Sequence, residues 1–186
     1  MGYGWEGDKV RLVPLERERH FEHTLLWMND PEVTRWTLVG DQPFGRLAEE
    51  EYFARTTGTT PNDAAFAIEL KETGEHIGFS AIHNIDWRHG IGLTGTIIGR
   101  TDLWRRGYGA DAAMTRTRYA FEVLGLRVLL SRVLADNVGS IGMLKKAGYR
   151  EVGRFPRLYW KRGAYRDVVE MMAERGEIAD PNRVPG

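Results

Sequence analysis

The stretch Trp104-Arg-Arg-Gly-Tyr-Gly-Ala-Asp-Ala-Ala113 lies between a β-branched run at 91–99 and a helix-like run at 107–124. Its glycines, Gly107 and Gly109, permit a backbone bend in which a side chain would clash. A bend of this kind opens a helix whose first N–H groups have no partner inside the helix. Those groups, together with the positive end of the helix dipole, favour a bound phosphate.

Two arginines, Arg105 and Arg106, place positive charge at the same corner. The stretch is not a Walker loop, because it lacks the Gly-Lys-Ser/Thr ending. It is also not the dinucleotide fingerprint, because Ala112 stands where the third glycine is needed. A phosphate site is therefore predicted here, and a surface turn with a basic helix start is the alternative.

A second motif, Asp136-Asn-Val-Gly-Ser-Ile-Gly-Met-Leu-Lys-Lys-Ala-Gly-Tyr149, follows downstream. The pair of motifs, Arg-Arg-Gly-Tyr-Gly-Ala and then Asn-x-x-Ser with Lys-x-Gly-Tyr, resembles the GNAT acyl-CoA N-acyltransferases. The chain looks most similar to their RimJ/RimL branch, the ribosomal-protein alanine acetyltransferase type. In that branch, Trp27-Met-Asn-Asp-Pro-Glu-Val33 is similar to the end of the N-terminal helix and Tyr165-Arg-Asp-Val-Val169 to the last strand. The resemblance covers about residues 8–173.

Length and composition limit the number of domains, the kinds of partner and the location that can be expected. The 186 residues suit one domain with its own core, predicted over 1–186 with a flexible tail at about 174–186. Basic and acidic residues both number 26, which argues against a broad nucleic-acid or membrane surface. The chain has no cysteine, so disulfides, zinc thiolates and a cysteine nucleophile are excluded. It shows no secretory signal and no apolar run of the roughly 18 residues that a membrane span needs, so a cytoplasmic location is expected.

The pattern of apolar residues predicts an α/β (α+β) fold. Strands are predicted at 9–15, 64–70, 76–83, 91–99, 126–134, 149–159 and 164–172, and helices at 16–28, 46–55, 107–124 and 137–147. This order indicates a mixed, mostly antiparallel sheet flanked by helices, which is also the GNAT-type fold that the resemblance implies. Gly92 and Gly95 inside one strand indicate a bulge or a close approach by a ligand. The resemblance implies that this strand splays from its neighbour and that a pantetheine arm pairs with it.

Charged side chains on two predicted helices are assigned to solvent. Arg116 and Arg118 are expected on the outer face of the helix at 107–124. The acidic run at 49–51 is expected to be a solvated helix start, favoured by the helix dipole, with an acidic rim that attracts a cationic amine as the alternative. Trp36, in a loop rich in glycine and proline, either covers a substrate cleft or packs on the core as a flap.

The residues that would hold acetyl-CoA follow from the first motif and from the resemblance. The predicted pyrophosphate contacts are the backbone groups of Arg105, Arg106, Gly107, Tyr108, Gly109 and Ala110. Ile97 and Ile98 are expected to border the pantetheine arm, and the resemblance implies that Asn137 contacts the same arm. The position of Asn137 also suits a helix N-cap, and both roles are compatible. No metal is predicted.

Acetyl transfer to an amine needs a held cofactor, a deprotonated amine and a stabilised thiolate. In many relatives, a tyrosine seven residues after the asparagine that corresponds to Asn137 is the general acid for the thiolate. This chain has Leu144 at that position. In the RimL type, the serine three residues after the asparagine is the proposed acid, and Ser140 matches it. The alternative for Ser140 is a capping residue in the first helical turn.

The general base is left open, because the carboxylates of relatives fall near Leu93 and Tyr159 in this chain. The candidates are His83, Asp86 and Tyr159. His83 is expected to end a strand that faces the cleft, and a histidine near pH 7 is a suitable base. The alternative for His83 is a structural histidine.

The missing carboxylates favour a weakly basic acceptor. An α-amine has a pKa near 8 and is partly neutral at pH 7, whereas a lysine or polyamine amine, near 10.4, needs a base. The sequence therefore predicts an N-acetyltransferase that moves the acetyl group of acetyl-CoA to a protein or peptide N-terminal amine by direct attack in a ternary complex. The alternatives are a small amine (a polyamine, an aminoglycoside-like drug or a metabolite) and a catalytically silent acyl-CoA-binding module. Neither nucleic acid nor membrane is an expected partner, and a homodimer is left open.

Overall fold

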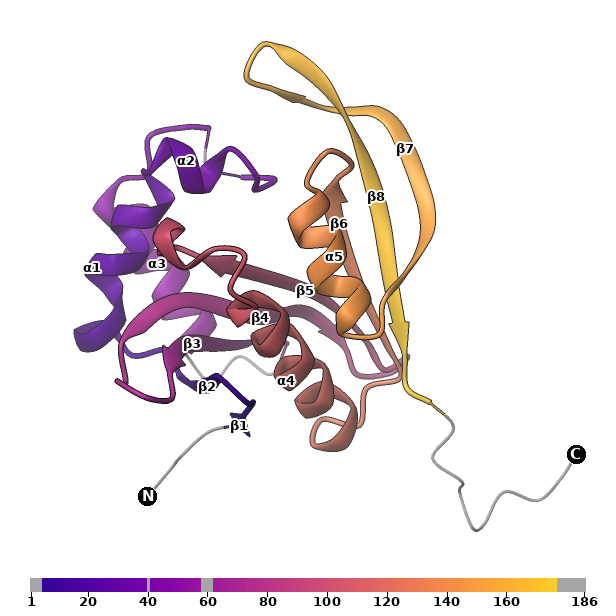
Figure 1. Ribbon diagram of the computed structural model, residues 1–186, viewed down its shortest axis with the longest axis horizontal. Coiled ribbons are helices and arrows are strands. Elements are labelled where there is room, and N and C mark those ends of the chain that lie inside the picture. Colours follow the sequence, from indigo (N-terminus) through magenta and orange to yellow (C-terminus); the bar gives the residue numbers. More distant parts are fainter. Residues whose placement is uncertain (1–4, 40, 58–61, 177–186) are drawn as a thin grey trace, which may run out of the picture.

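One mixed sheet runs through the molecule, with helices on both of its faces (Figure 1). The computed structural model describes residues 5–39, 41–57 and 62–176. In these residues the sheet has eight strands in the order β1-β2-β3-β4-β5-β6-β8-β7. The strands are β1 (Trp5–Glu6), β2 (Val10–Pro14), β3 (Ala64–Leu70), β4 (His76–Asp86), β5 (Ile91–Ile98), β6 (Val128–Leu134), β7 (Arg150–Lys161) and β8 (Ala164–Glu174). The helices are α1 (Arg17–Met28), α2 (Pro31–Thr34), α3 (Arg46–Thr57), α4 (Tyr108–Glu122) and α5 (Val138–Lys146), with a 3-10 turn at Thr101–Leu103.

The predicted mixed, mostly antiparallel sheet flanked by helices is confirmed. The short elements β1 and α2 were not predicted, because so few residues carry no readable periodicity. Strand β8 runs to Glu174, so this residue belongs to the sheet and not to the predicted tail, of which residues 177–186 lie outside the described part of the chain. Across the described ranges, no helix has the length and apolar character needed to cross a membrane.

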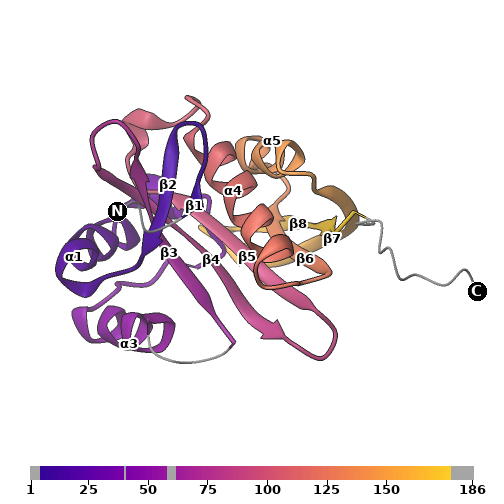
Figure 2. The ribbon, with the colours of Figure 1, turned by 90° about the horizontal axis from the view of Figure 1, so that it is seen from below.

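Both faces of the sheet are buried, and strand β2 illustrates why. Leu12 and Val13 are consecutive, so their side chains point to opposite faces. Leu12 packs in a cluster with Ala112 of α4, whereas Val13 packs with Phe21 of α1 and Phe53 of α3. Figure 2 shows α4 and the pair α1 and α3 on opposite sides of the sheet.

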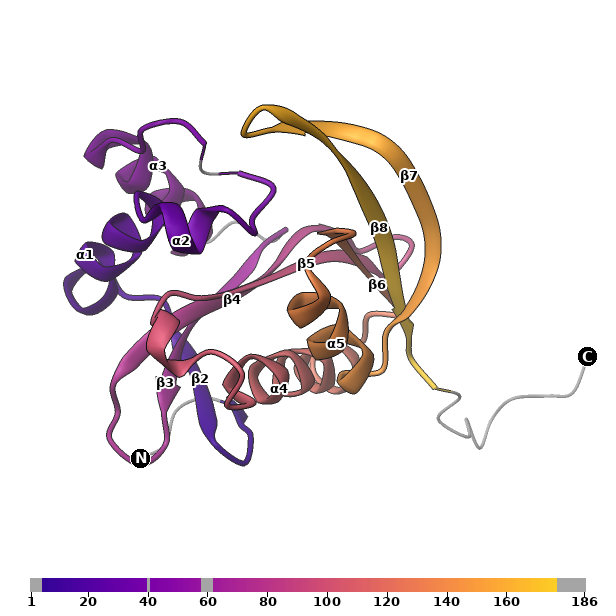
Figure 3. The same cartoon turned by 45° about the horizontal axis from the view of Figure 1, so that its top comes forward.

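The one parallel neighbour pair, β5 and β6, separates along its length. All other neighbouring strands of the described sheet are antiparallel. On β5 the pairing with β6 covers Ile91 to Leu93, opposite Val128 to Leu130, and both strands then continue without pairing to each other. Figure 3 shows them diverging, with the β7–β8 hairpin rising beyond. The predicted splay of this strand is therefore confirmed.

Two charged residues predicted to face solvent are buried, and both predictions were wrong. Arg116 is 1% exposed and Glu49 is 2% exposed. Arg116 follows Ala113 by three residues and precedes Ala120 by four, so helical geometry places it on the buried face of α4. The prediction had followed residue type instead of spacing. Glu49 lies at the start of α3, where burial raises the pKa of its carboxyl against a hydrogen bond with Thr24. Arg118 is exposed as predicted.

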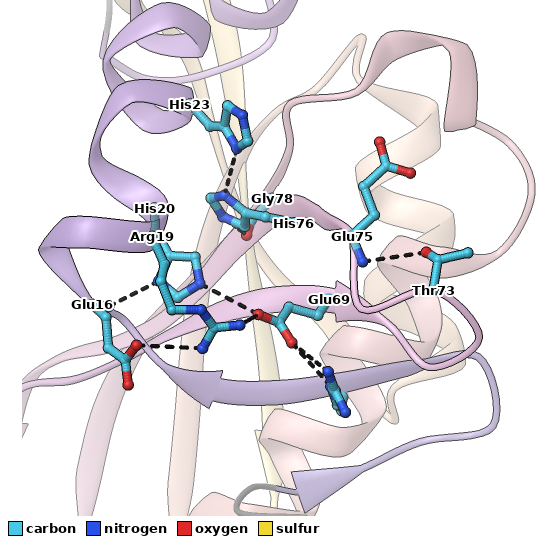
Figure 4. Close-up of polar contacts among 10 residues, drawn as sticks. Glu16, Arg19, His20, His23, Glu69, Thr73, Glu75, His76 and Gly78 are labelled. Atoms are coloured by element: carbon cyan, nitrogen blue, oxygen red, sulfur yellow. Dashed lines mark hydrogen bonds and ion pairs between the residues drawn. The ribbon is translucent and has the colours of Figure 1, made fainter.

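A buried histidine and a buried glutamate join α1 to β3 (Figure 4). His20 Nδ1 accepts the backbone N–H of Glu16 at 2.8 Å, so its proton is assigned to Nε2, which lies 3.4 Å from Glu69 Oε1. Arg11 and Arg19 pair with the same Glu69 carboxylate. Burial lowers the pKa of His20 although Glu69 opposes the shift.

A pair of histidines, His23 of α1 and His76 of β4, extends this cluster to β4. His76 Nε2 donates to the carbonyl of Gly78 at 2.9 Å, and its Nδ1 lies 3.3 Å from Nδ1 of His23. This arrangement assigns the accepting role to His76 Nδ1 and the donating role to His23. Burial, with the neighbouring histidines, lowers the pKa of His76 to about 3. The surroundings of His20 and His76 thus favour the neutral imidazole.

We therefore expect acid to destabilise the fold through His76. The unfolded chain binds a proton at this histidine near pH 6.5, whereas the folded chain binds it only near pH 3. The free energy of unfolding then falls as the pH drops from 6.5, and the contribution of His76 stops changing below about 3. Between pH 6.5 and about pH 5 this contribution amounts to about 2 kcal/mol.

Urea denaturation at several pH values tests this expectation, with His76→Gln as the comparison. The glutamine keeps a donor for Gly78 but does not titrate, so its stability should fall less with acid. His20 acts in the same direction and leaves a residual slope in the variant. Equal pH dependence of wild type and variant would contradict the assignment.

Candidate functional site

The loop that enters α4 has the backbone geometry of an anion site. Gly107 is the N-cap residue of α4 and adopts a left-handed conformation with φ of 88°. Trp104 Nε1 donates to the carbonyl of Ile98 at 2.8 Å, which fixes the loop to the end of β5. Gly107 has no side chain, so the first N–H groups of α4 remain accessible to a ligand. This geometry is compatible with a bound phosphate, whose place at the loop stays a prediction.

Gly109 has a different role from the bend proposed for it. It lies within the first turn of α4, and a Cβ atom there would approach Met143 Sδ of α5 to 3.1 Å and Ile98 of β5 to 3.5 Å. The absence of a side chain thus allows α4, α5 and β5 to meet closely. Among the two glycines of the motif, Gly107 makes the turn and Gly109 permits the packing.

Lys9 adds a cation at this loop that no local pattern predicted. Its Nζ donates to the carbonyl of Arg106 at 2.8 Å and lies 5.7 Å from the ring centre of Tyr108. Arg105, Arg106 and Lys9 are all exposed at this corner. Three cations, not two, therefore surround the predicted phosphate position.

Asp111 explains how Lys9 reaches this position. Its buried carboxylate accepts the backbone N–H groups of Asp8, Lys9 and Val10 at 3.0, 2.7 and 2.9 Å. These bonds attach the start of β2 to the first turn of α4. Asp111 and residues 8–10 lie about 100 positions apart in the chain, so this contact becomes visible only in the folded structure.

The gap between β5 and β6 begins at Thr94 and Ser131, where hydrogen bonds from side-chain hydroxyl groups follow the last backbone pairing of the two strands. Thr94 Oγ1 donates to the carbonyl of Leu130 at 3.1 Å, and Ser131 Oγ donates to the carbonyl of Thr94 at 3.0 Å. Beyond this point Gly95 is exposed, and a Cβ atom there would meet nothing within 4 Å. Ile97 and Ile98 are half-buried at the open end of the same strand. This part of β5 offers a free edge to an extended ligand, as predicted for the pantetheine arm.

The N-cap role of Asn137 is confirmed. Its Oδ1 accepts the backbone N–H of Ser140 at 3.0 Å, and its Nδ2 donates to the carbonyl of Trp36 at 3.3 Å. The side chain thus joins the first turn of α5 to the segment after α2. Contact with a cofactor arm remains a prediction for Asn137. Ser140 is half-buried in the same turn.

A cavity of about 520 Å³ lies at the end of β6, beside Asn137. Its walls come from α2 and the residues after it, the end of β6 and the β7–β8 hairpin. The lining residues are Pro31, Glu32, Arg35, Trp36, Leu134, Asp136, Lys161, Arg162 and Arg166. Trp36 therefore lines a cavity, which favours its cleft-covering role over the flap.

The turn of the β7–β8 hairpin is fastened to the segment around α2. Lys161 Nζ lies 2.6 Å from Asp41 Oδ2, and Arg162 Nε lies 3.1 Å from Asp41 Oδ1. Arg162 also donates to the carbonyl of Pro31 at 2.9 Å and to the hydroxyl of Thr34 at 3.0 Å. Desolvation acts to raise the pKa of Asp41, but the two cations outweigh it and lower this pKa. These bonds hold the hairpin over the cavity.

The candidate bases lie in different places. His83 faces α3, with its ring 6.4 Å from that of Tyr52 and its Nδ1 3.4 Å from Asp63 Oδ1. Burial lowers the pKa of His83 against the opposing effect of Asp63. Tyr159 lies on β7 opposite Arg166, a residue of the cavity wall.

Asp86 is not brought to the cavity. It lies at the end of β4 that pairs with the first residue of β5, away from the open end of the gap. Its carboxylate binds His89 at 2.8 Å, and this hydrogen bond lowers the pKa of Asp86. Within 5–39, 41–57 and 62–176, no three His, Asp or Glu side chains converge as a metal site requires.

Comparison with known proteins identifies the family of this architecture. Residues 9–150 match the family model described as an acetyltransferase (GNAT) domain. The uncharacterized N-acetyltransferase p20 of Bacillus licheniformis is 28% identical over 160 residues, which span 82% of this chain and 86% of that protein. The FsC-acetyl coenzyme A-N(2)-transacetylase of Aspergillus fumigatus is 26% identical over 184 residues, 91% of this chain and 72% of that protein.

A solved structure shows the same fold. Spermidine N-acetyltransferase from Vibrio cholerae, in complex with CoA and spermine, superposes with a TM-score of 0.78 at 20% sequence identity. The superposition covers 89% of this chain and 95% of that one. The predicted GNAT-type fold is thereby confirmed.

The left-handed turn at the start of α4 generates a direct prediction. A valine at position 107 would be strained at φ of 88° and would fill the space before the first N–H groups of α4. Gly107→Val should therefore abolish binding of CoA, measured by isothermal titration calorimetry.

Gly125→Val is the matched control, because Gly125 follows the other end of α4 with a similar φ of 68°. Both variants should lose about 1–3 kcal/mol of stability from backbone strain. Only the change at position 107 should affect CoA binding. Retained affinity in Gly107→Val, or equal losses in both variants, would refute the assignment of this loop.

Proposed function

Because the chain belongs to the acetyltransferase (GNAT) family and is an acetyl-CoA-dependent N-acetyltransferase, we propose that its acceptor is the α-amine of a peptide or protein N-terminus. This acceptor corresponds to the RimJ/RimL type. Direct attack of the amine on the thioester in a ternary complex suits a chain without cysteine. A cytoplasmic location and a homodimer remain predictions beside this proposal.

The charge of the cavity at the end of β6 carries the proposal. Four basic side chains and two acidic ones line it: Arg35, Lys161, Arg162 and Arg166 against Glu32 and Asp136. Asp41 pairs with Lys161 and Arg162, and Asp136 pairs with Arg166, so the surface keeps only a small excess of positive charge. It offers no net negative charge to a polyamine, which brings several positive charges. A peptide brings one amine followed by carbonyl oxygens, which basic side chains bind.

A small amine is the second candidate, supported by the likeness to the Vibrio cholerae spermidine N-acetyltransferase. That likeness extends to the whole fold, whereas the polar lining of the cavity belongs to this chain. A neutral or anionic small amine is compatible with the lining, so the cavity argues against polyamines in particular.

The cofactor in this proposal lies along the first motif and the free edge of β5. Its pyrophosphate rests on the backbone of residues 105–110 beside Lys9, and its pantetheine arm follows Ile97 and Ile98 toward Asn137. The open space at Gly95 and the left-handed turn at Gly107 both suit this path.

The proton transfers use His83 or Tyr159 on one side and Ser140 on the other. Burial lowers the pKa of His83, so its imidazole is neutral near pH 7 and able to accept a proton. The hydroxyl of Tyr159 interacts with Arg132 of β6, and Arg166, the partner of Tyr159 on β8, lines the cavity. Ser140 is the proposed donor to the departing thiolate.

Substitution of Ser140 tests its part of the proposal. Ser140→Ala keeps the backbone N–H that Asn137 caps, because only the side chain is removed. Turnover should fall by about tenfold or more while the affinity for acetyl-CoA changes little. Steady-state kinetics beside calorimetric affinity separates the two effects, and unchanged turnover would remove Ser140 as the acid.

The acceptor is tested by measuring thiol release from acetyl-CoA with peptides, spermidine, an aminoglycoside and amino acids. Peptides with a free N-terminus should be the best acceptors. Arg35 is exposed on the cavity wall, with its guanidinium over the ring of Trp36. Reversing its charge in Arg35→Glu should raise the KM for peptides by roughly threefold to tenfold and lower the KM for spermidine.

Arg88→Glu serves as control, because Arg88 is exposed in the turn between β4 and β5. It makes the same charge change far from the cavity and should leave both KM values unchanged. A preference of the wild type for spermidine would select the small-amine function instead. Retained CoA binding without turnover on any amine would select the silent acyl-CoA-binding module.

A further inference from the structure

Arg116 is a buried cation whose hydrogen-bond partners are all neutral. Its Nη1 donates to Thr96 Oγ1 at 2.6 Å, to the carbonyl of Gly95 at 2.9 Å and to Ser80 Oγ at 3.1 Å. Its Nη2 donates to the hydroxyl of Tyr149 at 3.3 Å, and its Nε has no hydrogen-bond partner in the described part of the chain. No ion pair of the described residues includes Arg116.

Stability does not account for this residue. A guanidinium is permanently charged in proteins, and removing it from water without an anion is unfavourable for folding. The retained charge therefore points to a role in what the protein does.

The location of Arg116 gives that role. Its guanidinium binds Gly95 and Thr96, which follow Leu93, the last residue of β5 that pairs with β6, and which still pair with β4 on their other side. Tyr149, its fourth partner, also contacts the hydroxyl of Thr94 at 3.1 Å. Arg116 thus lies under β5 at the closed end of the gap between β5 and β6.

The chemistry proposed above develops negative charge in this gap. The amine nitrogen forms a bond to the acetyl carbon, and the carbon–sulfur bond breaks with its electron pair leaving on sulfur. The amine loses a proton to the base, and the thiolate finally gains one from the acid or from water. Negative charge passes from the carbonyl oxygen to the sulfur while these bonds change.

We propose that Arg116 is a positioning residue that acts through the Gly95 carbonyl and the Thr96 hydroxyl, and whose fixed charge stabilises the oxygen and sulfur anions of acetyl transfer. This inference rests on the proposed function, because that function places the thioester in the gap. Arg116 donates no proton and does not need to touch the substrate. A preorganised charge in a site without water is effective because it requires no rearrangement during the reaction.

Three substitutions separate the charge from the packing. Arg116→Met removes the charge at similar length, and Arg116→Gln does so with a polar head that can still bind Gly95. Arg116→Lys keeps the charge. Thr117→Val is the control, because Thr117 is the next residue of α4, is 7% exposed and has a hydroxyl without a hydrogen-bond partner in the described residues.

The first readout is the ionisation of the thiol of bound CoA, followed by the ultraviolet absorbance of the thiolate during a pH titration. Wild type and Thr117→Val should ionise the thiol at the same pH. Arg116→Met and Arg116→Gln should require a higher pH, with Arg116→Lys between them. Identical titration in all variants would overturn the inference. This readout needs no acceptor, and Arg116→Gln decides it if the methionine variant does not fold.

The second readout is kinetic. In Arg116→Met, kcat should fall by about tenfold or more, with the KM for acetyl-CoA nearly unchanged, because the lost interaction exists mainly in the transition state. Stability in urea is measured beside kcat, because the Gly95 carbonyl and the Thr96 hydroxyl lose a donor in this variant. An unchanged kcat, or a loss of stability that accompanies every loss of rate, would overturn the inference. A wild type that binds CoA but acetylates no amine would refute the proposed function alone, and the thiol titration would still decide the role of Arg116.

Discussion

The parting of β5 from β6 is the constraint on which the site depends. Parallel pairing ends at Leu93, and hydroxyl groups of Thr94 and Ser131 hold the two strands together at that point. Each strand then continues with a free edge toward the helix that follows it in sequence. Gly95 follows Thr94 directly on β5 and is exposed, and a Cβ atom there would meet nothing within 4 Å, so the face of the strand beside the gap is open. The sheet therefore provides a slot with backbone groups along one side.

Two other parts of the fold approach the slot from different sides. Asp111 fastens the start of β2 to α4 and so brings Lys9 to the loop at Gly107. The β7–β8 turn reaches back to Asp41 through Lys161 and closes the cavity at the end of β6. Cofactor and acceptor would thus approach from different sides and meet in the gap. This arrangement suits direct transfer between two bound substrates.

Local signals in the sequence predicted most of the fold. The strands and helices followed from the spacing of apolar residues, and the loop at Gly107 followed from its glycines and arginines. The positions of Lys9 and Asp41 could not be predicted, because their partners lie far away in the chain. Arg116 had the correct spacing for burial, but residue type suggested solvent. The burial of a charge without an ion-pair partner cannot be predicted from local sequence, and this is why the prediction for Arg116 was wrong.

A crystal structure of the protein with CoA would show whether the cofactor occupies the gap between β5 and β6. We expect the pyrophosphate on the backbone of residues 105–110 and the pantetheine along Ile97 and Ile98. We also expect the sulfur between β5 and β6, near Gly95. A CoA molecule bound elsewhere, or a sulfur outside the gap while the pyrophosphate occupies the loop, would contradict this expectation.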